Sequence, residues 1–116
     1  MADNGAPKGL TLVLERKGEG AVVRCSGRLV AGHSDRLHRE VSAIIPETKR
    51  VVLDMTDLTH MDSAGIGALV RLYVSGKSAG CAVVLLNPGQ SIRQLLGVTH
   101  LINVLAIVGE NNIRMG

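Results

Sequence analysis

The sequence has almost no aromatic side chains: it contains no tryptophan, no phenylalanine and a single tyrosine, Tyr73. Aromatic rings supply the stacking platforms of most sites for single-stranded nucleic acid. The basic residues are spread along the chain rather than clustered, and the net charge is only +3. Because the sequence offers neither stacking rings nor a basic run, we expect no direct contact with nucleic acid.

The chain is also poor in groups that bind metals, cofactors or disulfide partners. Its two cysteines, Cys25 and Cys81, lie inside separate apolar stretches, and neither belongs to a C-x-x-C pair. The histidines show no metal-ligand spacing. The glycine-rich turn at 18–20 lacks the Gly-Lys-Ser/Thr sequence of a phosphate-binding loop. The sequence therefore predicts two buried free thiols, no metal and no cofactor.

Long apolar runs are missing as well. No stretch approaches the roughly 20 apolar residues that are needed to cross a bilayer, and the polar start of the chain does not resemble a secretion signal. We expect a soluble, cytoplasmic protein without direct membrane insertion. A chain of 116 residues is long enough for one hydrophobic core. We place this domain at 10–108, between a disordered segment at 1–9 and a tail at 109–116.

The first half of the chain predicts a β-hairpin followed by a helix. Leucines at 10, 12 and 14 alternate with Thr11, Val13 and Glu15, and residues 21–25 resume an extended pattern after a Gly-Glu-Gly turn. The period then becomes that of an amphipathic helix, with Ser34 or Asp35 as its N-cap and Pro46 as its stop. The apolar face of this helix consists of Leu37, Val41, Ile44 and Ile45.

The second half predicts strands that alternate with helices. The expected elements are a strand at 51–53, a loop at 56–62, a helix from Ser63 that ends before Gly80, a central strand at 81–86 buried on both faces, a short helix around 92–96 closed by Gly97, and a strand at 104–108. Such strands are parallel neighbours joined by right-handed crossovers. The fold class is therefore α/β, with a mixed sheet of one opening antiparallel hairpin plus parallel strands, covered by α-helices.

The most unusual residues surround the expected start of the second helix. Asp62 and Ser63 stand where a helix leaves its first backbone N–H groups unpaired, so either side chain could cap them. Capping is therefore one interpretation of Ser63, and a regulatory serine is another. Gly65 and Gly67 each cost about 1 kcal/mol of helix propensity relative to alanine. We expect something to approach this turn closely, either the backbone of a neighbouring strand or an incoming enzyme.

The residues at 51–54, the run Asp62-Ser63-Ala64-Gly65-Ile66-Gly67 and the strand after Gly80 together resemble the signature of STAS domains. The resemblance extends from about Leu10 to Val108. In the bacterial anti-sigma-factor antagonists of this family, a partner that is both anti-sigma factor and serine kinase phosphorylates the serine of the Asp-Ser-x-Gly motif. A separate Ser/Thr phosphatase removes the phosphate.

The resemblance implies specific roles for this segment. Ser63 is the implied phosphoacceptor, Asp54 and Asp62 are its acidic surroundings, and the partner-binding motif is completed by Ala64, Gly65, Ile66 and Gly67. Phosphorylation adds about 1.5 to 2 negative charges at pH 7. In a desolvated interface without a basic partner, such a charge costs several kcal/mol. The implied switch therefore releases the bound anti-sigma factor, whereas the unmodified domain binds it and frees the sigma factor.

Two other functions remain as alternatives. A STAS subunit of a lipid-transport ABC complex or of a stress-signalling complex would use the same surface for stable docking. A small enzyme would use Asp62 and Ser63 directly. His60, Asp62 and Ser63 are too close in sequence for a typical catalytic triad. The segment also lacks the glycine two residues before the serine that a nucleophile elbow needs. We therefore expect no catalytic activity.

Overall fold

The computed structural model describes residues 9–98 and 106–108. Its elements are β1 (Leu10–Lys17), β2 (Gly20–Leu29), α1 (Ser34–Ile44), the short 3-10 helix η1 (Ile45–Glu47), β3 (Arg50–Met61), α2 (Ser63–Ala79), β4 (Ala82–Leu86), α3 (Gln90–Val98) and β5 (Ala106–Val108). The predicted order of strands and helices is confirmed. The expected terminal segments, apart from Gly9, and the first two residues of the expected last strand lie outside the described residues.

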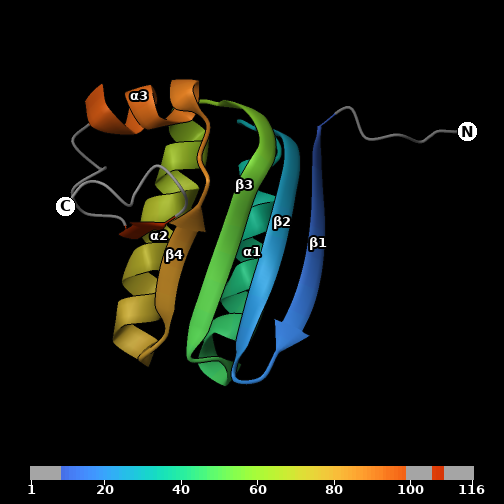
Figure 1. The fold of residues 1–116 in the computed structure, drawn as a ribbon, viewed down its shortest axis with the longest axis vertical. Coiled ribbons are helices and arrows are strands. Elements are labelled where there is room, and N and C mark those ends of the chain that lie inside the picture. The colour runs from blue at the N-terminus through green and yellow to red at the C-terminus, as the bar shows by residue number, and fades with distance from the viewer. Residues whose placement is uncertain (1–8, 99–105, 109–116) are drawn as a thin grey trace, which may run out of the picture.

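The strands form one mixed sheet in the order β1-β2-β3-β4-β5. β1 and β2 are an antiparallel hairpin, and the three following pairs are parallel, which confirms the predicted fold class. α1 and α2 lie side by side on one face of the sheet, and α3 lies at the end of the molecule where β3 ends (Figure 1). No helix among the described residues is both long and apolar enough to span a membrane.

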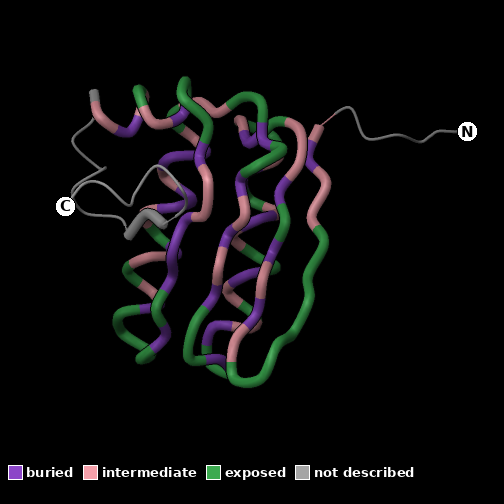
Figure 2. Tube along the Cα trace, viewed as in Figure 1, coloured by how far each residue is buried: buried purple, intermediate pink, exposed green. Residues whose placement is uncertain are grey.

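The hydrophobic core lies between the sheet and these two helices. Alternate residues of the central strands point toward the helices, and Figure 2 shows this as a regular change of colour along β2 and β3. Each buried Val, Leu or Ile side chain contributes about 1.5 to 3 kcal/mol relative to an exposed one. Residues fully buried in this core include Val23, Cys25, Leu37, Val41, Leu53, Met55, Leu69 and Leu72. Both cysteines are buried and free, as predicted.

The predicted loop at 56–62 is wrong, because β3 continues to Met61. Its second half remains paired with β2, and the pairing shifts its register twice, between Arg24 and Ser26 and between Gly27 and Arg28. These shifts interrupt the strict alternation of buried and exposed residues that a strand normally shows. The pattern of apolar and polar residues is therefore irregular at 56–60, although the backbone stays extended.

The ends of the helices differ from the prediction in detail. The N-cap of α1 is His33, whose side chain makes no capping hydrogen bond, and Ser34 is the first helical residue rather than the cap. The α-helix ends at Ile44, and Pro46 lies in the 3-10 turn that follows, so the predicted stop is confirmed. α3 includes Gly97 and ends at Val98, so this glycine does not close the helix.

Candidate functional site

Ser63 is the first residue of α2 and follows directly on the end of β3. Its side chain is exposed. No hydrogen bond to its hydroxyl is found within residues 9–98 and 106–108. Because the oxygen is neither covered nor engaged by these residues, a partner protein has access to it.

Asp62, and not Ser63, is the N-cap of α2. One carboxylate oxygen, Oδ1, accepts hydrogen bonds from the backbone N–H groups of Ala64 at 2.9 Å and Gly65 at 3.2 Å. The other oxygen, Oδ2, accepts one from the backbone N–H of Ala31 at 3.0 Å. These donors satisfy the unpaired start of the helix. The capping role is therefore filled without the Ser63 hydroxyl.

The same hydrogen bonds fix the charge beside Ser63. They lower the pKa of Asp62 below its ordinary value; the bond from Ala31 contributes most, and it outweighs the opposing effect of desolvation. Asp62 is therefore a carboxylate at neutral pH. A negative group is permanently held next to the exposed serine.

Gly65 lies against the end of β2. A Cβ atom at this position would be 2.3 Å from the carbonyl oxygen of Leu29 and 2.8 Å from Cγ of Met61. This close approach was predicted for the turn, and the group that approaches is the neighbouring strand backbone. The glycine therefore lets α2 begin directly against β2.

Gly67 does not share this role. A Cβ atom built on Gly67 has no neighbour within 4 Å, so the close approach expected there is absent among the described residues. Ala64, between Ser63 and Gly65, is half-buried, whereas Ile66, between the two glycines, is buried in the core. Ile66 thus anchors the motif in the core, and there is open space beside Gly67.

Asp54 is not brought to Ser63. In β3 it lies between the buried residues Leu53 and Met55, so its side chain points to the face of the sheet opposite the helices. Its carboxylate accepts hydrogen bonds from Thr56, from the backbone N–H at 3.0 Å and from Oγ1 at 2.6 Å, and lies 3.8 Å from Nε of Arg24. The expectation that Asp54 belongs to the acidic surroundings of Ser63 gains no support from these contacts.

Two contacts near the site are not predicted from the sequence. The backbone N–H of Ala31, in the turn between β2 and α1, binds Asp62 although 31 residues separate them. Arg28 and His60, both exposed, are paired across β2 and β3 close to the end of each strand. The register shifts bring these two residues together, and no local pattern in the sequence predicts this pairing.

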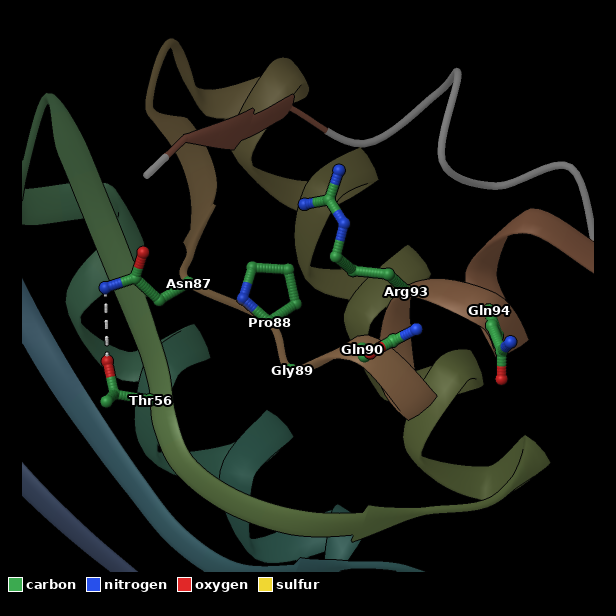
Figure 3. Close-up of a pocket in the computed structure, with 7 residues that line it drawn as sticks. All are labelled: Thr56, Asn87, Pro88, Gly89, Gln90, Arg93 and Gln94. Atoms are coloured by element: carbon green, nitrogen blue, oxygen red, sulfur yellow. Dashed lines mark hydrogen bonds between the residues drawn. The ribbon is translucent and has the colours of Figure 1, made fainter. Parts of the chain in front are cut away.

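A crevice of about 490 Å³ opens where the chain leaves β4 for α3 (Figure 3). Asn87 has a positive φ of 53° there, and its Nδ2 donates a hydrogen bond to Oγ1 of Thr56 at 3.3 Å. The crevice is lined by Thr56, Asn87, Pro88, Gly89, Gln90, Arg93 and Gln94. Within the described part of the chain, no group of three or more His, Cys, Asp or Glu side chains is placed to hold a metal ion.

The STAS domain profile matches residues 11–113, nearly the whole chain. This chain belongs to the STAS domain family. Among solved structures, this STAS domain is similar to the anti-sigma factor antagonist SpoIIAA in its unphosphorylated form, with a TM-score of 0.74 and 21% identity over 89% of this chain and 92% of that chain. An anti-sigma factor antagonist from Mycobacterium paratuberculosis has a TM-score of 0.73 and 24% identity, over 90% of this chain and 89% of that chain.

Sulfate transporters are also among the relatives of this STAS domain. Sulfate transporter 1.2 of Arabidopsis thaliana is 31% identical over 72 residues, which are 62% of this chain but only 11% of the transporter. High affinity sulfate transporter 2 of Stylosanthes hamata is 29% identical over 69 residues, 60% of this chain and 10% of the transporter. A solved sulfate transporter family protein from Wolinella succinogenes has a TM-score of 0.67 and 24% identity, over 76% of this chain and 72% of that chain.

Proposed function

We propose that this STAS domain is a phosphorylation-regulated anti-sigma-factor antagonist with Ser63 as its phosphoacceptor. In the unmodified state it binds an anti-sigma factor that is also a serine kinase, and it thereby frees a sigma factor in the bacterial cytoplasm. A Ser/Thr phosphatase restores the unmodified state. The domain itself catalyses nothing. The observation that carries the proposal is the exposed hydroxyl of Ser63 at a helix start that Asp62 already caps.

The capping geometry decides how a phosphate on Ser63 would act. A phosphate at a helix start is normally stabilised by the free backbone N–H groups of the first turn. Here the N–H groups of Ala64 and Gly65 are already bound to Asp62. The phosphate would either displace this carboxylate or remain beside it. In both cases two anionic groups share one small surface, and a partner without basic groups there is repelled.

Known structures with this fold support the proposal. SpoIIAA has been solved in its unphosphorylated form and in its phosphorylated form, and both forms resemble this chain, with TM-scores of 0.74 and 0.69. In that protein the fold therefore tolerates the phosphate. An effect of phosphorylation at the surface, rather than on folding, fits this precedent.

The direct test is phosphate transfer from ATP. The purified chain is incubated with ATP and the candidate anti-sigma kinases of its own organism, and intact mass is measured. We expect one added phosphate, none on Ser63→Ala, and normal transfer to a Ser78→Ala control, since Ser78 is an exposed serine near the other end of α2. Transfer to Ser63→Ala would refute the assignment of the acceptor. An absence of transfer with every cognate kinase would refute the switch.

A second function is favoured by the sulfate transporter relatives, which are 31% and 29% identical to this chain over 72 and 69 residues. In this alternative the domain docks stably on a membrane transporter, such as a lipid-transport ABC complex, or within a stress-signalling complex, with no turnover of phosphate. Purification from the native organism distinguishes the two. A small ATPase of the histidine-kinase type as the copurifying protein supports the switch, and a transporter subunit supports the alternative.

A further inference from the structure

The outer edge of β1 is regular, and it is open from Leu12 onward; at Leu10 the backbone carbonyl already accepts a hydrogen bond from Nη1 of Arg36 at 2.7 Å. β1 is the first strand of the sheet and pairs with β2 along its whole length without a bulge. The backbone N–H of Arg28 donates to the carbonyl of Gly9 at 3.0 Å, which identifies this pair as hydrogen-bonded. Since hydrogen-bonded pairs alternate in an antiparallel ladder, the odd-numbered residues of β1 face β2. Leu12 and Leu14 therefore turn their N–H and C=O groups outward.

These outward groups have no backbone partner among the described residues. A long flat edge of this kind is a template for a further strand, and most proteins protect it with a bulge, a proline or charges. β1 carries charges only at its hairpin end, at 15–17. Its centre has none of these protections.

Apolar side chains accompany the open backbone. Large hydrophobic residues that stay exposed in the described part of the chain are Val13 (51%), Leu14 (42%) and Val74 (55%). Two of them are neighbours at the centre of β1, where Val13 points to the face without helices and Leu14 to the other face. Figure 2 shows this half of β1 exposed throughout. The fold of a single chain gives no reason for apolar residues on both sides of a free edge.

We propose that β1 pairs with β1 of a second copy of this chain, so that two sheets join into one across a two-fold axis. The strands run antiparallel, and Val13 lies opposite Val13. In this register Leu12 of each copy lies opposite Leu14 of the other, and the two residues exchange backbone hydrogen bonds through groups that have no partner among the described residues. Both exposed apolar residues of β1 are then covered by apolar ones.

The charges of β1 favour this arrangement. In the proposed register Thr11 lies opposite Glu15, and no like charges oppose each other. A shift by two residues toward the hairpin places Val13 opposite Glu15 instead, and a further shift places Glu15 opposite Glu15. A parallel pairing would align the charged segments at 15–17 side by side. The edge is therefore self-complementary in the register that places Val13 opposite Val13.

The dimer leaves the site of Ser63 free. β1 runs antiparallel to β2, and the end of β2 contacts the start of α2. The two-fold axis therefore directs the two copies of Ser63 toward opposite ends of the joined sheet. The dimer is thus independent of the function proposed for Ser63. It would be a symmetric assembly with two distant docking surfaces, one on each copy.

Sedimentation over a wide range of protein concentration tests the dimer. We expect a monomer–dimer equilibrium for the wild type and weakening by at least about tenfold for Val13→Lys, because the axis places two lysines opposite each other. Val74→Lys changes an equally exposed valine on α2 and should leave the equilibrium unchanged. Circular dichroism confirms that both variants are folded. A wild type that stays monomeric, or a dimer that responds equally to both variants, overturns the proposal.

Disulfide trapping tests the register. Residues in a non-hydrogen-bonded antiparallel pair have Cα atoms about 4.5 Å apart, within the range of a disulfide. Val13→Cys should therefore form a covalent dimer under mild oxidation, whereas Val74→Cys should not. Cys25 and Cys81 are 1% exposed and do not compete. Equal cross-linking of both variants, or none with Val13→Cys, contradicts the proposed pairing even if the chain dimerises.

Discussion

The carboxylate of Asp62 accepts a hydrogen bond from the backbone N–H of Ala31 at 3.0 Å, across 31 residues of sequence. The same carboxylate caps α2 through Ala64 and Gly65. One side chain therefore joins the turn after β2 to the start of the helix that carries Ser63. The position of the candidate acceptor depends on this link, because Ser63 directly follows Asp62.

Replacement of Asp62 tests this link through its pH dependence. The pKa of Asp62 is lowered in the folded state, so its stabilising effect is complete above the ordinary value of 3.8 and is lost as the pH falls through the folded-state pKa. We expect Asp62→Asn to lower the thermal midpoint at pH 7, and the difference from the wild type to shrink in acid below pH 3.8. Thermal unfolding followed by circular dichroism at a series of pH values measures this. A difference that stayed constant down to the lowest pH would show that the charge of Asp62 is not involved.

The two glycines of the motif should respond oppositely to alanine. Gly65→Ala places a Cβ atom 2.3 Å from the carbonyl oxygen of Leu29, and we expect it to lower the free energy of unfolding by about 1 to 3 kcal/mol. Gly67→Ala meets no atom within 4 Å and gains helix propensity, so it should raise stability by up to about 1 kcal/mol. Urea unfolding of both variants is the measurement. Equal effects of the two substitutions would contradict the packing described for Gly65.

The sequence predicts the order of the elements and the hairpin because these depend on local patterns: alternation, helical spacing and turn residues. It also predicts that Ser63 begins a helix, since Asp62 and Gly80 mark the two ends. It misses the second half of β3, because two register shifts against β2 break the alternation.

The sequence also leaves the contacts of the site undecided. The family resemblance places Asp54 in the acidic surroundings of Ser63, but the alternation of β3 turns Asp54 to the face of the sheet opposite the helices. Gly65 and Gly67 look alike in sequence, and only the position of Leu29 distinguishes them. These outcomes depend on pairing between distant segments, which no local pattern encodes.

The buried thiol of Cys25 should be inert while the protein is folded. Burial raises the pKa of Cys25 to about 12, and the negative charge of Asp54 adds to the effect. At pH 8 the reactive thiolate is then roughly one part in ten thousand. We expect a thiol reagent to modify Cys25 at a rate set by unfolding and to react at once in denaturant. Mass mapping of the modified residue gives the result, and fast labelling of Cys25 in the folded chain would disprove its burial.

The charge at Ser63 should control partner binding without affecting the fold. If the proposed switch is correct, Ser63→Ala keeps its affinity for the anti-sigma kinase but cannot be released by ATP, whereas Ser63→Asp binds at least about tenfold more weakly, because its carboxylate joins that of Asp62 on the same surface. Calorimetric titration of the kinase with each variant measures both effects. Ser78→Asp adds the same charge to an exposed serine near the other end of α2 and should bind like the wild type. If Ser63→Asp and Ser78→Asp bind equally well, a negative charge at Ser63 does not release the partner, and the proposed mechanism is wrong.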